Sequence, residues 1–195
     1  QHSEGVAELM KSFALANDFA EIYLCCGLLH DLGKYSTGFQ KYIRSNGNKE
    51  PHARWGAYMA LKSKLINIAF PVIGHHAGLP NRDAMFEDLE ICAKDGNRWN
   101  EIQRAMEEDK AIIPICDNSP FDKIGDVFQK ELFIRLLYSA LVDADSLDTE
   151  RHFEKEQFDA RSSKTLDVDP LLTALNKRFE SFKQDTPLNE LRTNV

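Results

Sequence analysis

A histidine and an aspartate stand side by side at the end of an apolar run, Tyr23 to Lys34 (YLCCGLLHDLGK). Neutral imidazole and ionised carboxylate are both ligands of first-row transition metals, and together they suit Mn, Fe, Co, Ni or Zn. Because neighbouring residues on an α-helix point about 100° apart, His30 and Asp31 can fan into one pocket. Gly33 fits the left-handed position that often ends a helix. The pair predicts a metal site at the end of a buried helix.

Further potential ligands follow along the chain. Six histidines are present, and a second adjacent pair, His75 and His76, lies beside a glycine in VIGHHAGLP. His52 lies between the two pairs, and a later apolar segment carries Asp143 and Asp145. These residues are enough for two metal ions that share one ligand.

Each potential ligand also has a structural alternative. His52 could be a core or helix-capping histidine, and His76 could support the ligands without contacting the metal itself. His2 stands near the start of the chain, where helix ends fray. His152 is assigned to the surface. Lys34 fits a phosphate contact and a solvated surface lysine equally well.

Apolar spacing predicts an all-α fold with a buried site. Helices are expected over residues 2–17, 19–32, 36–45, 52–70, 71–78, 81–94, 98–109, 126–147 and from 169 onward. Pro71 is expected to begin a new helix. Residues 110–124 are predicted to be an irregular connection, and residues 149–165 to wrap the surface. The length fits one domain over residues 1–184, with a tail or the start of a linker over 185–195.

Composition narrows the class of protein. The formal net charge of −7 argues against a nonspecific nucleic-acid coat. It does not exclude a nuclease, because bound cations would neutralise an acidic pocket. No apolar run is long enough to span a membrane, and the start is polar. The four cysteines form no CxxC pair and are expected to be buried, reduced thiols of a cytoplasmic protein. A chain that begins at Gln1 without methionine is expected to be part of a longer one.

Two weaker patterns concern nucleic acid. Basic residues outnumber acidic ones between Asp31 and Lys64, which fits a DNA-facing strip or, more simply, a solvated helix face. Tyr35, Phe39 and Trp55 could stack on bases, but aromatic residues at apolar spacing are more often part of a core.

Read together, five segments resemble one known family. They are HSEGVAELMKSFA, LLHDLGKYSTGFQKYI, HARWGAYMA, GHHAGLP and SALVDADSLDTE. In order and spacing they resemble the HD nuclease domain of the type I CRISPR-associated helicase-nuclease, a branch of the HD phosphohydrolase superfamily. The resemblance covers roughly residues 2–150 and implies a compact, all-α HD-domain bundle with a buried metal site.

The resemblance implies roles for the potential ligands. The ligands of one metal would be His2, His30, Asp31 and Asp145. The ligands of the second would be Asp31, His52, His75 and His76, with Asp31 bridging. Asp145 is preferred to Asp143 because the superfamily's late aspartate usually follows alanine, and two residues about 200° apart on a helix cannot both face the site. Asp31 and Lys34 are the expected catalytic residues.

The implied activity is cleavage of single-stranded DNA in type I CRISPR interference. The implied cofactors are one or two divalent ions of Mn, Ni, Co or Fe, and Mg is a further candidate. Two cations about 3.5–4 Å apart can activate a water for attack on phosphorus. The implied partners are single-stranded DNA, a helicase domain or subunit, and an RNA-guided surveillance complex; no membrane is expected. The chain itself has no GxxxxGK[ST] phosphate loop.

Two other functions stay open. One is an HD-family nucleotide or cyclic-dinucleotide phosphohydrolase, although HHAGLPNRD lacks the GYP segment of the cyclic-dinucleotide enzymes. The other is a degenerate domain that only binds a partner. The complete ligand set argues against it, because buried ionisable groups cost free energy when they are unpaired.

Overall fold

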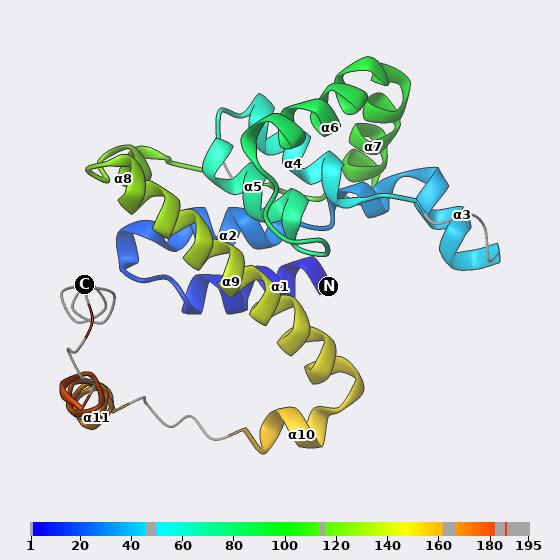
Figure 1. Ribbon diagram of the computed structural model, residues 1–195. Coiled ribbons are helices and arrows are strands. Elements are labelled where there is room, and N and C mark those ends of the chain that lie inside the picture. The colour runs from blue at the N-terminus through cyan, green and yellow to red at the C-terminus, as the bar shows by residue number, and fades with distance from the viewer. Residues whose placement is uncertain (1, 46–49, 114–115, 162–166, 182–185, 187–195) are drawn as a thin grey trace. The chain divides into compact units, whose positions relative to one another are not determined.

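The computed structural model describes residues 2–45, 50–113, 116–161, 167–181 and 186. Every regular element in these ranges is helical (Figure 1), which confirms the all-α prediction. The elements before the long α9 are α1 (His2–Ser12), η1 (Asn17–Phe19), α2 (Ala20–Leu29), η2 (Leu32–Tyr35), α3 (Thr37–Ser45), α4 (Ala53–Lys62), α5 (Ile66–Gly74), α6 (Arg82–Lys94), α7 (Gly96–Glu108) and α8 (Ser119–Asp122). They are followed by α9 (Val127–Phe153), α10 (Lys155–Asp159) and α11 (Val168–Glu180).

The chain divides into two units, Gln1–Asp159 with α1 to α10 and Ala160–Val195 with α11. The predicted tail, residues 185–195, lies outside the described residues except for Thr186. The second unit contains α11, which corresponds to the helix expected from residue 169 onward. Its apolar side chains, Leu171, Leu172, Leu175 and Phe179, are between 43% and 54% exposed.

The first unit is built around α2. This helix is apolar on nearly all sides, and its buried residues are Ile22, Tyr23, Cys25, Cys26, Gly27 and Leu29. A helix of this kind must be covered all round by other elements. Accordingly α1 packs along α2, α4 and α5 pack against it as a pair, and α9 crosses α1, α2 and α5 (Figure 1).

The close approach of α4 to α2 depends on a glycine. A Cβ atom on Gly56 would lie 1.8 Å from the carbonyl oxygen of Leu29, the last residue of α2. Only glycine permits backbones to approach this closely. The contact brings the beginning of α4, with His52, to the end of α2.

The prediction of a single helix over residues 52–70 is wrong. The segment is two helices, α4 and α5, separated at Lys64, whose φ is +62°. Leu65 N–H donates to Ala60 O at 2.9 Å and Lys64 N–H to Leu61 O at 3.0 Å, the two hydrogen bonds of a Schellman helix end. The left-handed residue is usually glycine, so a lysine there gave no signal in the sequence.

Other boundaries also differ from the predictions. Pro71 lies inside α5 and does not begin a helix. The first helix ends at Ser12, and the connection over residues 110–124 contains α8 in its described part. The helix predicted over residues 126–147 continues to Phe153, because its last turns contain no glycine or proline.

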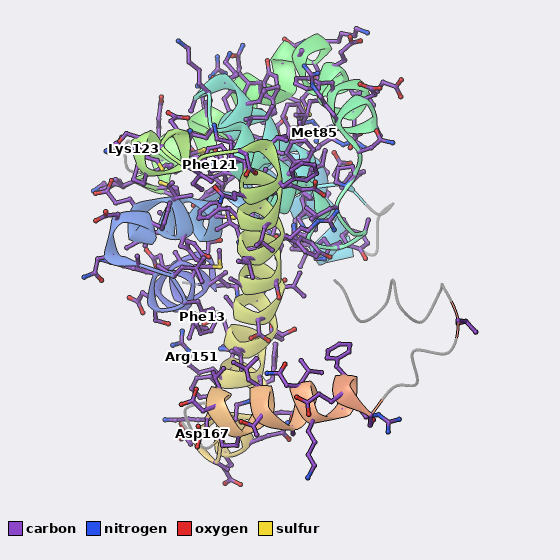
Figure 2. All side chains as sticks on the ribbon, turned by 60° about the vertical axis from the view of Figure 1, so that its left-hand side comes forward. Phe13, Met85, Phe121, Lys123, Arg151 and Asp167 are labelled. Carbon is purple, nitrogen blue, oxygen red and sulfur yellow. The ribbon has the colours of Figure 1, made fainter. Side chains whose placement is uncertain are left out.

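Along α9, one stripe of side chains is buried: Phe133, Leu137, Leu141, Ala144 and Asp148. Its spacing of three and four residues is that of a single helix face. Phe128 and Leu132 lie outside this stripe and are 77% and 57% exposed. Figure 2 shows Phe121 beside the first half of α9 and Arg151 near its C-terminal end.

Several smaller predictions can be compared with the structure. Phe39 and Trp55 are buried, so their assignment to the core is confirmed, and Trp55 stacks on Trp99 with ring centroids 6.4 Å apart. None of the four cysteines, all of which lie in the described ranges, forms a disulfide; three are buried and Cys116 is partly exposed. Among the helices of the described ranges, none has the length and apolar character required to cross a bilayer.

Candidate metal centre

The site forms where helix ends meet. His30 is the C-cap residue of α2, His75 is the C-cap residue of α5, and His52 is the N-cap residue of α4. His2 begins α1. Because α2 is central and the other helices pack against it, these ends converge on Asp31, the N-cap residue of η2.

The two C-cap histidines are oriented in the same way. The Nδ1–H group of His30 donates to the carbonyl oxygen of Gly27 at 2.6 Å, and that of His75 donates to the carbonyl oxygen of Val72 at 2.7 Å. Each acceptor lies three residues back, among the carbonyls that a helix end leaves without a partner. A neutral imidazole that donates from Nδ1 has its lone pair on Nε2, the form in which histidine binds metal.

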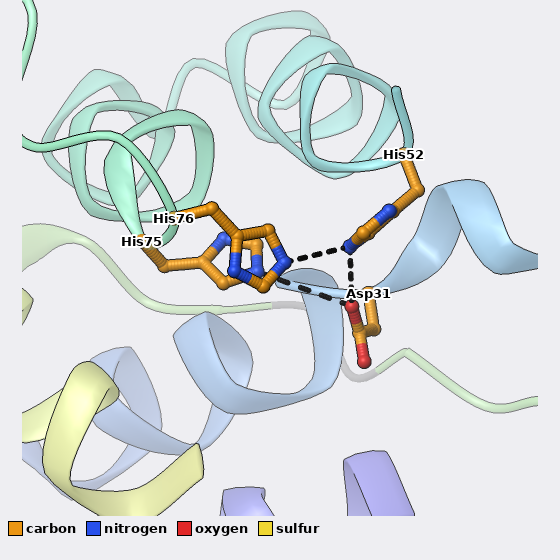
Figure 3. A group of neighbouring side chains, drawn as sticks. All are labelled: Asp31, His52, His75 and His76. Carbon is orange, nitrogen blue, oxygen red and sulfur yellow. Dashed lines mark hydrogen bonds and ion pairs between the residues drawn. The ribbon is translucent and has the colours of Figure 1, made fainter. Parts of the chain in front are cut away.

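The residues around Asp31 form two groups, and each group faces one of its two carboxylate oxygens. Oδ1 lies 3.1 Å from His52 Nε2 and 3.9 Å from His75 Nε2. Figure 3 shows these rings with His76, whose Nε2 lies 2.9 Å from His52 Nε2. Two unprotonated nitrogens repel at this distance, so a proton or a cation must lie between them.

Oδ2 of Asp31 faces the second group. It lies 3.2 Å from His30 Nε2 and 3.7 Å from His2 Nε2. Asp145 Oδ1 adds a further oxygen, 3.1 Å from His2 Nε2 and 3.9 Å from His30 Nε2. The Asp31 carboxylate therefore lies between the two groups, with one oxygen facing each.

These residues fit divalent metal ions. The potential ligand atoms of Asp31, His52, His75 and His76 all lie within 4.8 Å of one another, and so do those of His2, His30 and Asp31. The Nε2 atoms of His30 and His75 are buried and have no hydrogen-bond partner. A buried acceptor without a partner costs roughly 1–3 kcal/mol, a cost that coordination of a cation would remove.

The electrostatics of the metal-free site agree with this arrangement. Burial alone would raise the pKa of Asp31, but its contacts with His30 and His52 and the charge of Lys34 hold it well below its usual range. Burial lowers the pKa of His75 to about 4. The hydrogen bond to Asp145 raises the pKa of His2, against a lowering by burial. The centre therefore keeps a carboxylate and a neutral imidazole at neutral pH, the protonation states that bind metal.

The backbone after α2 differs from the prediction. The helix ends at Leu29, not at residue 32, and Gly33 is not left-handed; it lies in η2. A Cβ atom on Gly33 would lie 2.2 Å from the carbonyl oxygen of His52 and 2.7 Å from its Cα atom. This glycine is therefore required by the approach of His52, whose ring also packs against Phe39 with centroids 4.9 Å apart.

Of the two late aspartates, Asp145 lies beside the site, with its Oδ1 3.1 Å from His2 Nε2, while Asp143 is exposed on the other side of α9. Sequence reasoning missed Asp148, which is 7% exposed. Its Oδ2 accepts a hydrogen bond of 2.7 Å from the Nδ1–H group of His2, and its Oδ1 pairs with Arg151. The signal was the spacing from Asp145, since residues three apart on a helix share a face.

Lys34 lies beside the centre, where its ammonium group pairs with Asp31 Oδ2. The basic residues that follow do not form one free strip. Arg54 pairs with Asp88 at 3.0 Å, and Lys62 lies over the rings of Tyr58 and Trp99. Lys49 lies outside the described residues.

An all-helical bundle with histidines and a shared aspartate at its helix ends is the architecture of a metal-dependent hydrolase. Comparison with protein families agrees, since the HD domain matches residues 1–118. The chain therefore belongs to the HD-domain family, whose members are generally metal-dependent phosphohydrolases. A comparison with curated proteins found no match.

Proposed function

We propose that this chain is a metal-dependent nuclease domain that cleaves single-stranded DNA in type I CRISPR interference. The observation that carries the proposal is the division of ligands about Asp31, with a histidine group on each carboxylate oxygen. Two cations held on either side of one bridging carboxylate are typical of enzymes that hydrolyse phosphodiesters. The order of the segments HDLGK, HARWGA, GHHAGLP and ADSLDTE favours the nuclease branch within the family.

The residues have distinct roles in this proposal. His30 and His75 are fixed by their backbone hydrogen bonds, so they would hold cations without reorganising. Bound cations would supply an activated water and neutralise negative charge on the phosphodiester. Lys34 is paired with Asp31 in the metal-free protein. If cations engaged the carboxylate, the Lys34 ammonium group would be available to a non-bridging phosphate oxygen.

The ligand chemistry favours transition metals over Mg²⁺. Imidazole nitrogens outnumber carboxylates in the His52 group and equal them in the His2 group, whereas Mg²⁺ prefers oxygen ligands in an octahedral arrangement. We expect Mn²⁺, Co²⁺ or Ni²⁺ to support activity better than Mg²⁺. The partners of the proposal are a helicase domain or subunit and an RNA-guided surveillance complex that exposes the displaced strand.

The test is cleavage of circular single-stranded DNA by the purified chain after chelation, with each metal added separately. Asp31→Ala removes the residue that both groups share and is expected to abolish cleavage. Asp143→Ala is the matched control, because it removes an exposed carboxylate elsewhere. Free nucleotides and cyclic dinucleotides are offered in parallel.

The outcomes separate the possible functions. Metal-dependent cleavage that is lost in Asp31→Ala and kept in Asp143→Ala supports the nuclease. Hydrolysis of nucleotides or cyclic dinucleotides without DNA cleavage replaces it by the phosphohydrolase alternative. A folded protein that binds no metal would indicate a partner-binding domain.

A further inference from the structure

A cavity of about 560 Å³ opens beside the metal centre, within the first unit. It is lined by His2, Lys34, Asp148, Thr149, Arg151, His152 and Phe153. His2 connects the cavity to the centre, because its Nε2 lies 3.7 Å from Asp31 Oδ2. Apart from His2 and Lys34, the lining comes from the last turns of α9.

Cationic groups in the cavity are held in place by acidic partners. Arg151 pairs with Asp148 and also lies over the ring of Phe158 in α10, 5.9 Å from its centroid. Its side chain is 38% exposed and that of Lys34 is 39% exposed, so both can reach a ligand. An arginine held in one orientation loses little entropy when its remaining N–H groups meet phosphate oxygens.

Phe153 supplies a different kind of surface. Its side chain is 77% exposed, and its ring meets that of His152 edge to face at 4.8 Å. On α9 it lies eight residues beyond Asp145, about 12 Å along the axis at 1.5 Å per residue. This separation is comparable with the length of one nucleotide from its phosphate to the far edge of its base.

We propose that this cavity binds the nucleotide next to the scissile phosphate, with Phe153 stacking on its base and Arg151 and Lys34 contacting phosphate oxygens. The inference rests on the proposed nuclease function and gives its preference for single strands a structural basis, since a base inside a duplex has no free face to offer. Stacking on an aromatic ring accepts any base, so the subsite selects single strands without selecting sequence.

The first test is binding, measured without metal so that it does not depend on activity. Fluorescence anisotropy compares a single-stranded oligothymidylate with an oligomer of the same length in which every base is removed and the sugar–phosphate chain is kept. We expect Phe153→Ala to weaken binding of the base-bearing strand about five- to tenfold, with a much smaller effect on the abasic strand. Phe153→Trp should restore the preference, because its larger ring also stacks.

Phe128→Ala is the matched control. Phe128 lies on the same helix and is also 77% exposed, but it is near the opposite end of α9. Arg151→Gln should behave differently from Phe153→Ala and Phe128→Ala. It should weaken binding of the base-bearing and the abasic strand alike, and it should lower the salt dependence of binding by about one phosphate contact.

Activity then separates the subsite from the nuclease function. If the wild-type chain cleaves single strands and Phe153→Ala lowers cleavage of the base-bearing strand more than that of the abasic strand, the subsite is supported. Equal binding of the base-bearing strand by Phe153→Ala and Phe128→Ala overturns the subsite, even if cleavage is intact. Absence of metal-dependent cleavage by the wild-type chain would refute the nuclease function, while the binding comparison would still report on Phe153.

Discussion

Asp148 orients His2, and its removal should weaken metal binding in one group while sparing the other. The ring of His2, in the first turn of α1, meets that of His30 with centroids 5.5 Å apart. The hydrogen bond from its Nδ1–H group to Asp148, 2.7 Å long and part-buried, leaves Nε2 directed at Asp31 and Asp145. Loss of such an outer partner typically lowers metal affinity 10- to 100-fold, or about 1.4–2.8 kcal/mol.

We expect Asp148→Ala to lower the metal affinity of the His2 group within this 10- to 100-fold range. Arg151 also loses its partner, but its side chain is 38% exposed and water can solvate it. The remaining cost therefore falls on His2. Asp148→Asn keeps an oxygen that can accept from Nδ1–H but loses the negative charge, so we expect a smaller reduction, roughly three- to tenfold.

The assay is calorimetric titration with Mn²⁺ or Co²⁺ in a His52→Ala background. This background removes a ligand of the other group, so that the remaining binding reports on the His2 group. Asp143→Ala in the same background is the control, and thermal unfolding confirms that each variant is folded. If folded Asp148→Ala binds metal as tightly as the Asp143→Ala control, Asp148 does not orient His2 and the reasoning is refuted.

Three further predictions concern packing, pH and metal. Gly33→Ala should destabilise the fold by about 1–3 kcal/mol, because its Cβ atom would meet the backbone of His52, whereas Gly96→Ala, with no atom within 4 Å, should not; chemical denaturation compares the two. In the metal-free protein, the free energy of unfolding should fall as pH decreases from 6.5 to about 4, because the unfolded state takes up a proton that folded His75 excludes. The contribution is about 3 kcal/mol, and His75→Leu should flatten the profile measured by denaturation at several pH values. The raised pKa of His2 acts at higher pH, because the stabilisation it gives is complete below the unfolded pKa of 6.5 and adds little slope in this window. Metal at 100 times its dissociation constant should stabilise the folded protein by about 2.7 kcal/mol, seen as a rise in Tm that chelation reverses and Asp31→Ala removes.

The residues of the centre could be predicted from the sequence because metal chemistry restricts them to few types. His30 and Asp31 are adjacent, and His75 and His76 repeat the arrangement, so residue type alone singled them out. Their geometry could not be predicted in the same way. The backbone of Asp31 leaves the helix, with φ −108° and ψ 14°, whereas an ordinary helical residue was expected.

The features that the sequence did not predict have one physical cause in common. They depend on contacts between segments that are distant in the sequence. Lys64 takes a left-handed conformation that its residue type disfavours, and Leu65, which follows it, is buried. Gly33 is needed for the approach of His52 and not for a left-handed turn. Local patterns report helix propensity and periodicity, but they do not report which distant backbone will lie beside a given residue.

The end of α9 connects these points with function. A helix that ended at residue 147, as its apolar pattern indicates, would exclude Asp148, Arg151 and Phe153. The charged segment DTERHF continues the helix because glutamate and arginine are good helix formers and nothing in it breaks the helix. One uninterrupted helix can therefore present Asp145 to the metal centre, Asp148 to His2, and Phe153 to the cavity at helical spacing. If both proposals hold, α9 fixes the distance between the metal ions and the base-stacking ring, and inserting one residue after Asp148 should uncouple strand binding from metal binding.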